Sequence, residues 1–150
     1  MSKTTIKEKD RGWKRFIVKT KGRPSVAIGI QGEKGNQDRD GLTNVMLGTI
    51  HEFGTANIPE RSFLRSTFDE NYKKYIQEYN ALFTKAIASG DLKGNLMLLG
   101  EKVRSDVLKK IKSKLQPALS AATIAKKGGE DTPLIDTGQM WNAISVEVRD

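Results

Sequence analysis

The chain has 150 residues and a net charge of +8, with 37% hydrophobic residues, 29% charged residues and no cysteine. This length suits one domain with its own core and is too short for two ordinary domains. The lack of cysteine excludes disulfides and thiolate metal sites and fits a reducing compartment. No apolar run is long enough for a transmembrane helix, and the N-terminus lacks the apolar part of a secretory signal, so we expect a soluble protein made in the cytoplasm.

Positive charge is concentrated in two segments. Residues 1–24 and residues 102–127 each have a net charge of +7, whereas residues 25–101 and 128–150 have −2 and −4. Basic segments can contact the phosphates of nucleic acid, but basic-to-acidic contacts between subunits of a ring use the same asymmetry. The charge pattern therefore leaves a solvated surface, nucleic-acid binding and subunit contact open.

The N-terminal part of the chain predicts a helix, a strand and a loop. Within residues 9–20, Trp13 and Phe16 lie at helical spacing, which predicts a short amphipathic helix. The β-branched run over residues 25–30 predicts a strand. Residues 32–41 contain no large apolar side chain that could anchor them, so we expect a mobile loop there.

The middle of the chain predicts a short helix followed by a long one. Residues 42–53 have apolar side chains every three or four positions, and Gly54 is placed to cap that helix. Pro59 is placed to begin the next helix, because the first turn does not need its missing N–H. That helix carries a long apolar stripe: Leu64, Phe68, Tyr72, Tyr75, Ile76, Tyr79, Leu82, Phe83 and Ile87. The helical register of the three tyrosines favours packing in a core or between subunits over base stacking.

A second stripe follows Gly90, interrupted at Gly94 and Gly100 and stopped by Pro117. Its members are Leu92, Leu96, Leu99, Val103, Val107, Ile111 and Leu115. Two antiparallel helices that pack these stripes together would supply most of the core.

The C-terminal part predicts a short helix and a strand. Ser120 can cap a helix that runs to Lys127, and residues 128–132 form a polar hinge. Residues 143–148 alternate apolar and polar side chains, so they predict a strand that pairs with residues 25–31. The expected fold is a single α+β domain over residues 1–150, mainly helical, with two long amphipathic helices packed on a small antiparallel sheet.

Enzymatic chemistry has little support in this sequence. Residues 134–138 contain Asp136-Thr137-Gly138, which is similar to the active-site turn of homodimeric aspartic proteases. Those proteases are almost all β, so we favour a turn in which the Asp136 side chain accepts backbone N–H groups. The single histidine, His51, has no second histidine four residues later, and we expect it to cap or pack. We predict no enzyme, no metal site and no cofactor.

Two motifs combine turn-forming residues with bulky apolar ones. They cover residues 51–65 and residues 133–140, and each fixes a corner of the backbone. With the strand over residues 26–30 and the segment 117–127, they resemble the tail-completion or neck proteins that join head to tail in tailed bacteriophages. This family more usually has proline where the chain has Ser62, and also at the position of Ala118, which reduces local rigidity here.

The resemblance implies a virion protein, present in the host cytoplasm during assembly, that forms a ring of six copies in the neck or at the top of the tail. Its partners would be head connector or neck proteins and tail tube or tail terminator proteins, close to the genomic DNA and away from membranes. The structural and interface candidates are Phe53, Gly54, Pro59, Arg61, Phe63, Asp136, Thr137 and Gly138. Among them, Gly54 permits a left-handed residue, Pro59 sets the next helix, and Arg61 offers a planar fork to a carboxylate, such as one on a neighbouring subunit.

Overall fold

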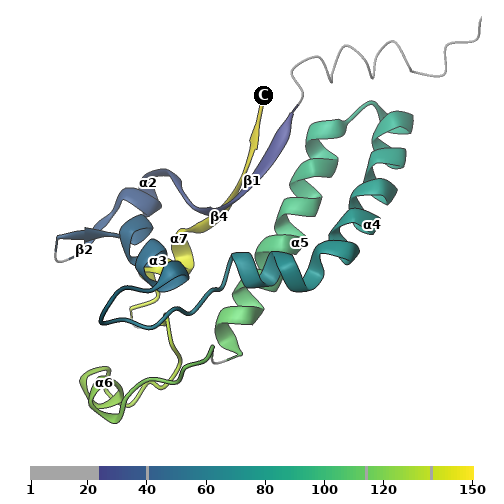
Figure 1. Cartoon of the computed structure of the whole chain (residues 1–150). Helices are drawn as coiled ribbons and strands as arrows, with labels where there is room; N and C mark the ends of the chain where they lie inside the picture. The colour runs from purple at the N-terminus through teal and green to yellow at the C-terminus, as the bar shows by residue number, and fades with distance from the viewer. Residues whose placement is uncertain (1–23, 40, 114, 136) are drawn as a thin grey trace, which may run out of the picture.

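The computed structural model describes the chain from residue 24 onwards, apart from three single positions: residues 24–39, 41–113, 115–135 and 137–150. The helix predicted over residues 9–20 therefore lies outside the described residues. The elements follow one another as β1 (Ser25–Ile30), α2 (Gly32–Asn36), β2 (Asp38–Arg39), β3 (Leu42–Thr43), α3 (Asn44–Phe53), α4 (Arg65–Ser89), α5 (Leu92–Lys112), α6 (Ala121–Lys126), α7 (Gln139–Ala143) and β4 (Ile144–Arg149) (Figure 1).

The main sheet joins the two ends of the described chain. β1 and β4 pair antiparallel, with Ser25 opposite Arg149 and Ile30 opposite Ile144. This confirms the predicted pairing of the first strand with the last. A second, two-stranded sheet is the small β2–β3 hairpin.

Helix α5 lies at the centre of the fold, between α4 and the β1–β4 sheet (Figure 1). All seven residues of the second predicted stripe are buried, which confirms that stripe. The helix runs without interruption through both glycines. Gly100 allows a close approach to the sheet, because a Cβ there would lie 2.3 Å from Val146 Cγ1 and 2.8 Å from Val26 Cγ2. Gly94 lies in the first turn, where its N–H donates to the Asp91 carboxylate at 3.0 Å.

Three ion pairs join α4 to α5 as an antiparallel ladder. The pairs are Glu70–Lys110 at 2.5 Å, Lys74–Asp106 at 2.7 Å and Glu78–Lys102 at 3.2 Å. Their spacing of four residues on each helix keeps all of them on one flank of the hairpin. The Tyr75 hydroxyl also donates to Asp106, at 3.2 Å. Burial, helped by the Asp106 charge, raises the pKa of Tyr75, so it remains a neutral donor. The ladder fixes the register of the two helices, and the predicted mainly helical α+β fold is confirmed.

Helix α4 differs from its prediction in two ways. It begins at Arg65, and Pro59 lies in the exposed loop before it, so the predicted start at Pro59 was wrong. The physical reason is a side-chain cap from α3, described below. The apolar stripe is also only partly covered: Tyr75 is buried, but several neighbours on the same helix are exposed, namely Phe68, Tyr72, Ile76 and Tyr79.

The predicted loop over residues 32–41 contains regular structure, in the form of α2 and one strand of the β2–β3 hairpin. α2 needs no large apolar residue, because the buried Gly35 lets its backbone lie against Ile30 and Val45. The Asn44 side-chain amide, itself buried, donates to the Lys34 carbonyl at 2.8 Å. α6 begins with the predicted Ser120 cap and projects away from the body of the molecule (Figure 1). α7 was not predicted.

Candidate subunit interface

The first corner is a closed turn between α3 and α4. Gly54 caps α3 with a φ of +71°, and its N–H donates to the Ile50 carbonyl at 2.8 Å. A Cβ on Gly54 would lie 2.8 Å from the backbone nitrogen of Glu60, so both the space and the backbone conformation favour glycine. The Arg61 N–H then donates to the His51 carbonyl at 2.8 Å, which brings the chain back beside α3. The predicted cap at Gly54 is confirmed; its φ is positive, but its ψ of 179° lies outside the left-handed helical region that we expected.

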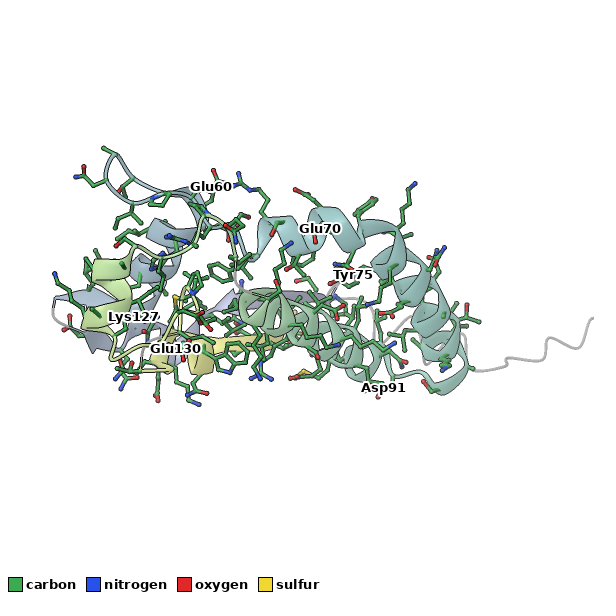
Figure 2. The ribbon with its side chains drawn as sticks, turned by 90° about the horizontal axis from the view of Figure 1, so that it is seen from below. Glu60, Glu70, Tyr75, Asp91, Lys127 and Glu130 are labelled. Carbon is green, nitrogen blue, oxygen red and sulfur yellow. The ribbon has the colours of Figure 1, made fainter. Side chains whose placement is uncertain are left out.

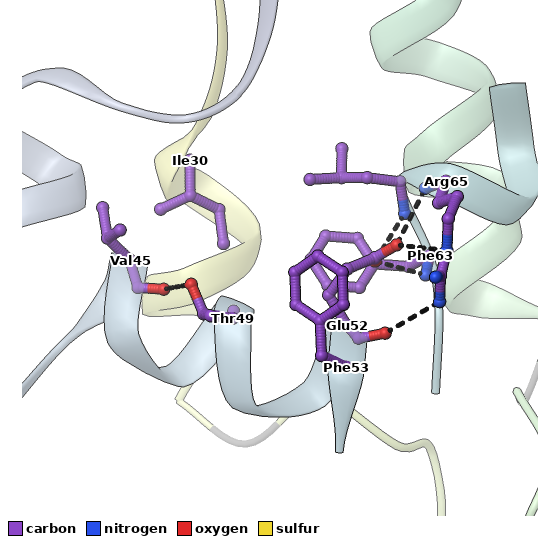
Figure 3. A pocket seen from close by; sticks show the side chains of 9 residues that line it. Ile30, Val45, Thr49, Glu52, Phe53, Phe63 and Arg65 are labelled. Carbon is purple, nitrogen blue, oxygen red and sulfur yellow. Dashed lines mark hydrogen bonds and ion pairs between the residues drawn. The ribbon is translucent and has the colours of Figure 1, made fainter. Parts of the chain in front are cut away.

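Glu52 holds this corner together (Figure 3). Its buried carboxylate accepts the backbone N–H groups of Phe63 at 2.8 Å and of Leu64 and Arg65 at 2.9 Å, and it also accepts the Ser62 hydroxyl at 2.7 Å. The first N–H groups of a helix have no partner within the helix, and the helix dipole favours an anion beside them. Glu52 therefore decides that α4 begins at Arg65.

An apolar pocket of about 280 Å³ opens between α3 and the start of α4 (Figure 3). It is lined by Ile30, Val45, Gly48, Thr49, Glu52, Phe53, Phe63, Leu64 and Arg65. Phe63 is fully buried, whereas the Phe53 side chain at the rim is 62% exposed. The Arg65 guanidinium carbon lies 5.3 Å from the Phe53 ring centre, and Arg65 also pairs with Glu60. The Glu52 carboxylate already accepts hydrogen bonds from this chain. What the pocket offers to a binding partner is therefore apolar surface and one exposed aromatic ring.

Arg61 joins this corner to the segment that follows α5. Its side chain is 6% exposed, and its guanidinium donates to the Pro117 carbonyl at 2.6 Å and to the Ala118 carbonyl at 3.2 Å. The expected carboxylate partner is thus replaced by two backbone carbonyls of the same chain. Burial lowers the pKa of Arg61 from its ordinary value. Arg61 anchors the base of the projecting segment that carries α6.

His51 packs beside Arg61 without a partner for Nδ1 among the residues that the structure describes. Burial lowers the pKa of His51, and the positive charges of Arg61 and Lys127 lower it further. The lowered pKa favours the neutral imidazole, which is consistent with the expected packing role.

The second corner begins α7. Gly138 has a φ of +77° and its carbonyl accepts the Asn142 N–H at 2.9 Å, while Thr137 is exposed. Asp136, and with it the expected turn role of its carboxylate, lies outside the described residues. α7 packs against α3, so the two corners are linked through these helices.

Among the residues that the structure describes, no group of three or more histidine, cysteine, aspartate or glutamate side chains could hold a metal ion. None of the helices that the structure describes is long and apolar enough to cross a membrane. No protein-family model matches the chain, and searches of curated proteins and of solved structures found no match either.

Sequence reasoning missed Glu52, the residue with the most hydrogen bonds at this site. In a local capping pattern, the carboxylate lies close in sequence to the N–H groups that donate to it. Glu52 instead lies on the preceding helix. The available signal was an acidic residue in the last turn of a predicted helix, where the helix dipole disfavours it. Such an unfavourable placement indicates that the carboxylate has a partner elsewhere.

Proposed function

We propose that this chain is a structural subunit of a tailed-bacteriophage virion. In this proposal it forms a ring, with six copies, in the neck or at the top of the tail and joins head to tail. Its partners are further copies of itself, the head connector or neck proteins on one side and the tail tube or terminator proteins on the other. The chain acts by fitting surfaces together and catalyses no reaction.

The proposal rests on the segment 51–65, whose buried polar side chains form hydrogen bonds within the same chain. Glu52 and Arg61 are buried and bonded to the backbone, so they fix shape and are unavailable for chemistry. Next to them, the pocket and the exposed Phe53 ring present apolar surface. Rigid apolar surface with an aromatic anchor is typical of protein interfaces. The same segment also carries the sequence resemblance to neck proteins.

The test replaces Phe53 with lysine in a phage that depends on this chain. We expect Phe53→Lys to leave heads and tails separate in electron micrographs and to lower the yield of infectious particles at least 100-fold. Met46→Lys is the matched control, because Met46 is an exposed apolar residue on the same helix that does not line the pocket. Infectious particles of normal structure without this chain would disprove the proposal.

The alternative is a nucleic-acid-binding module that uses the two basic segments. Part of the segment 102–127 has internal partners, since Lys102, Lys109 and Lys110 form ion pairs with acidic residues of the same molecule. Phosphate contact would compete with those pairs. Duplex DNA binding whose affinity falls steeply as salt rises would support the alternative, and absence of binding at moderate salt would remove it.

A further inference from the structure

Within the described residues, the β1–β4 sheet has two strands, so each strand has one edge without a neighbouring strand. Helix α5 packs along this sheet (Figure 2 shows β4, in yellow, beside α5, in green). A free strand edge presents unpaired N–H and C=O groups, which can bond to a strand of another chain. The two edges are therefore possible contact surfaces if their backbone groups are free.

The Gln31 side chain shows which backbone groups point outward. Its amide donates to the carbonyls of Ala27 on β1 and Ser145 on β4, both at 3.3 Å. Adjacent strands lie about 4.8 Å apart, so one amide could not reach both carbonyls if they pointed away from opposite edges. Both therefore point into the β1–β4 ladder, and the even-numbered residues, which alternate with them, point their backbone groups outward. Arg104 agrees with this direction, because its Nε reaches the Ile144 carbonyl from α5 at 2.7 Å.

Both edges have free backbone groups. On β1 they belong to Val26 and Ile28, and on β4 to Val146 and Val148. No loop backbone or side chain bonds to these groups in the part of the chain that the structure describes. The β4 edge also opens into a groove of about 530 Å³, whose lining includes residues 144–146. An added strand would therefore find both room and hydrogen-bond partners beside β4.

We propose that the β4 edge of one copy pairs with the β1 edge of the next copy, so that one antiparallel sheet continues around the ring. This inference rests on the proposed ring and names the contact between its copies. A ring needs two different surfaces that fit each other, whereas a contact between identical surfaces closes as a dimer. The two edges of this sheet form such a pair of different surfaces.

The strand directions and the side-chain pattern suit this pairing. β1 and β4 are antiparallel within one copy, so copies related by rotation place β1 antiparallel to β4 of the neighbour. Val26 then pairs with Val148 of the neighbouring copy, and Ile28 pairs with Val146, with their outward groups joined by hydrogen bonds. This register keeps the apolar side chains of both strands on the α5 side of the sheet.

Neither edge has the features that commonly prevent strand addition. Natural proteins block open edges with proline, with a bulge or with charged side chains. The two strands contain no proline, and their register runs from Ser25 opposite Arg149 to Ile30 opposite Ile144 without a bulge. β1 also contains no charged residue. The charged residues of the pair lie on β4, where Glu147 would face the small Ala27 of the next copy.

Single cysteines test this pairing, because the natural chain contains none. Across the proposed contact, Ala27 and Glu147 are opposite each other without mutual backbone hydrogen bonds, a geometry with Cα atoms about 4.5 Å apart that suits a disulfide. We expect mixed disulfide dimers when the Ala27→Cys and Glu147→Cys variants are combined and oxidised. Ser145→Cys is the matched control on the same face of β4. Its diagonal position, about 7–8 Å away, should give at least tenfold fewer dimers with Ala27→Cys.

The same variants exclude other pairings. If Glu147→Cys alone gives more dimers than the mixture, two β4 edges pair about a two-fold axis and the proposal is wrong. Equal yields with Glu147→Cys and Ser145→Cys would mean random collision and would also overturn it. So would the absence of mixed dimers at several hundred µM protein.

Amide hydrogen exchange tests the contact in the unmodified chain. In dilute protein the Gly29 and Glu147 N–H groups, which lie in the β1–β4 ladder, should exchange slowly, and those of Val146 and Val148 quickly. In concentrated protein, exchange at Val146 and Val148 should become at least tenfold slower, and unchanged rates there would contradict the proposal. Phe53→Lys should leave the mixed dimers unchanged. Failure of the head-to-tail function and failure of this contact are therefore distinguishable.

Discussion

Helices α4 and α5 carry equally regular apolar stripes, but the stripes lie in different surroundings. Every stripe residue on α5 itself, from Leu92 to Ile111, is buried, because α4 covers one side of the helix and the β1–β4 sheet covers another. On α4 the stripe packs mainly against α5, so Tyr75 is buried while Tyr72 is largely exposed. The spacing of apolar residues therefore identifies the apolar side of a helix, but it does not say how many neighbours cover that side.

The sharpest test of this difference substitutes the same residue type on both helices. Ile111→Ala on α5 should lower the free energy of unfolding by about 3–4 kcal/mol, because Ile111 is fully buried and the change leaves a cavity. Ile76→Ala on α4 should lower it by less than about 1 kcal/mol, because Ile76 is already partly exposed. Urea denaturation measures both. Equal losses would mean that α4 is covered as closely as α5.

The starts of the two helices offer a second contrast, between a distant cap and a local one. Glu52→Ala removes the acceptor of three backbone N–H groups at the start of α4 and should cost about 3 kcal/mol. Asp91→Ala removes an ordinary N-cap from α5 and should cost about 1 kcal/mol. Glu60→Ala is the control for loss of an exposed carboxylate nearby and should change stability by less than about 0.5 kcal/mol. Thermal unfolding ranks the three, and a Glu52 effect no larger than that of Asp91 would contradict this account.

The two glycines of α5 test how the sheet covers that helix. Gly100→Ala should destabilise by about 2 kcal/mol, because its Cβ would overlap the β-branched side chains of Val146 and Val26. Gly94→Ala should be close to neutral, since alanine favours helix by up to about 1 kcal/mol but its Cβ would displace the Asp91 carboxylate that caps the Gly94 N–H. Chemical denaturation distinguishes them. A tolerated Gly100→Ala would show that α5 does not approach the sheet so closely.

The smallest expected effect is a pH dependence at the first corner. Burial holds the pKa of His51 below its ordinary value of 6.5, so the unfolded chain binds more protons than the folded chain once the pH falls below that value. Stability should therefore decrease as the pH is lowered through this range. His51→Gln should reduce the slope of stability against pH between pH 7 and pH 5. An unchanged slope would show that His51 titrates normally in the folded chain.

Much of the fold could be predicted because its signals are local. The buried stripe of α5, the Ser120 cap of α6 and the Gly54 cap of α3 each depend on residues within a few turns of one another. The site was only partly predictable. The segment 51–65 was recognised as a rigid corner, but the pocket beside Phe53 needs Ile30 from β1, which is distant in the sequence.

The sequence by itself determined which side chains are apolar, where most helices end and which terminal segments pair as strands, because those features follow from residue spacing and backbone preference. Only the tertiary structure decided that Glu52 starts α4, that Arg61 binds the Pro117 carbonyl, and that α2 packs through Gly35. It also decided that Phe68, Tyr72, Ile76 and Tyr79 on α4 remain exposed. These outcomes depend on distances between segments far apart in the chain, and periodicity along a single segment contains no information about such distances.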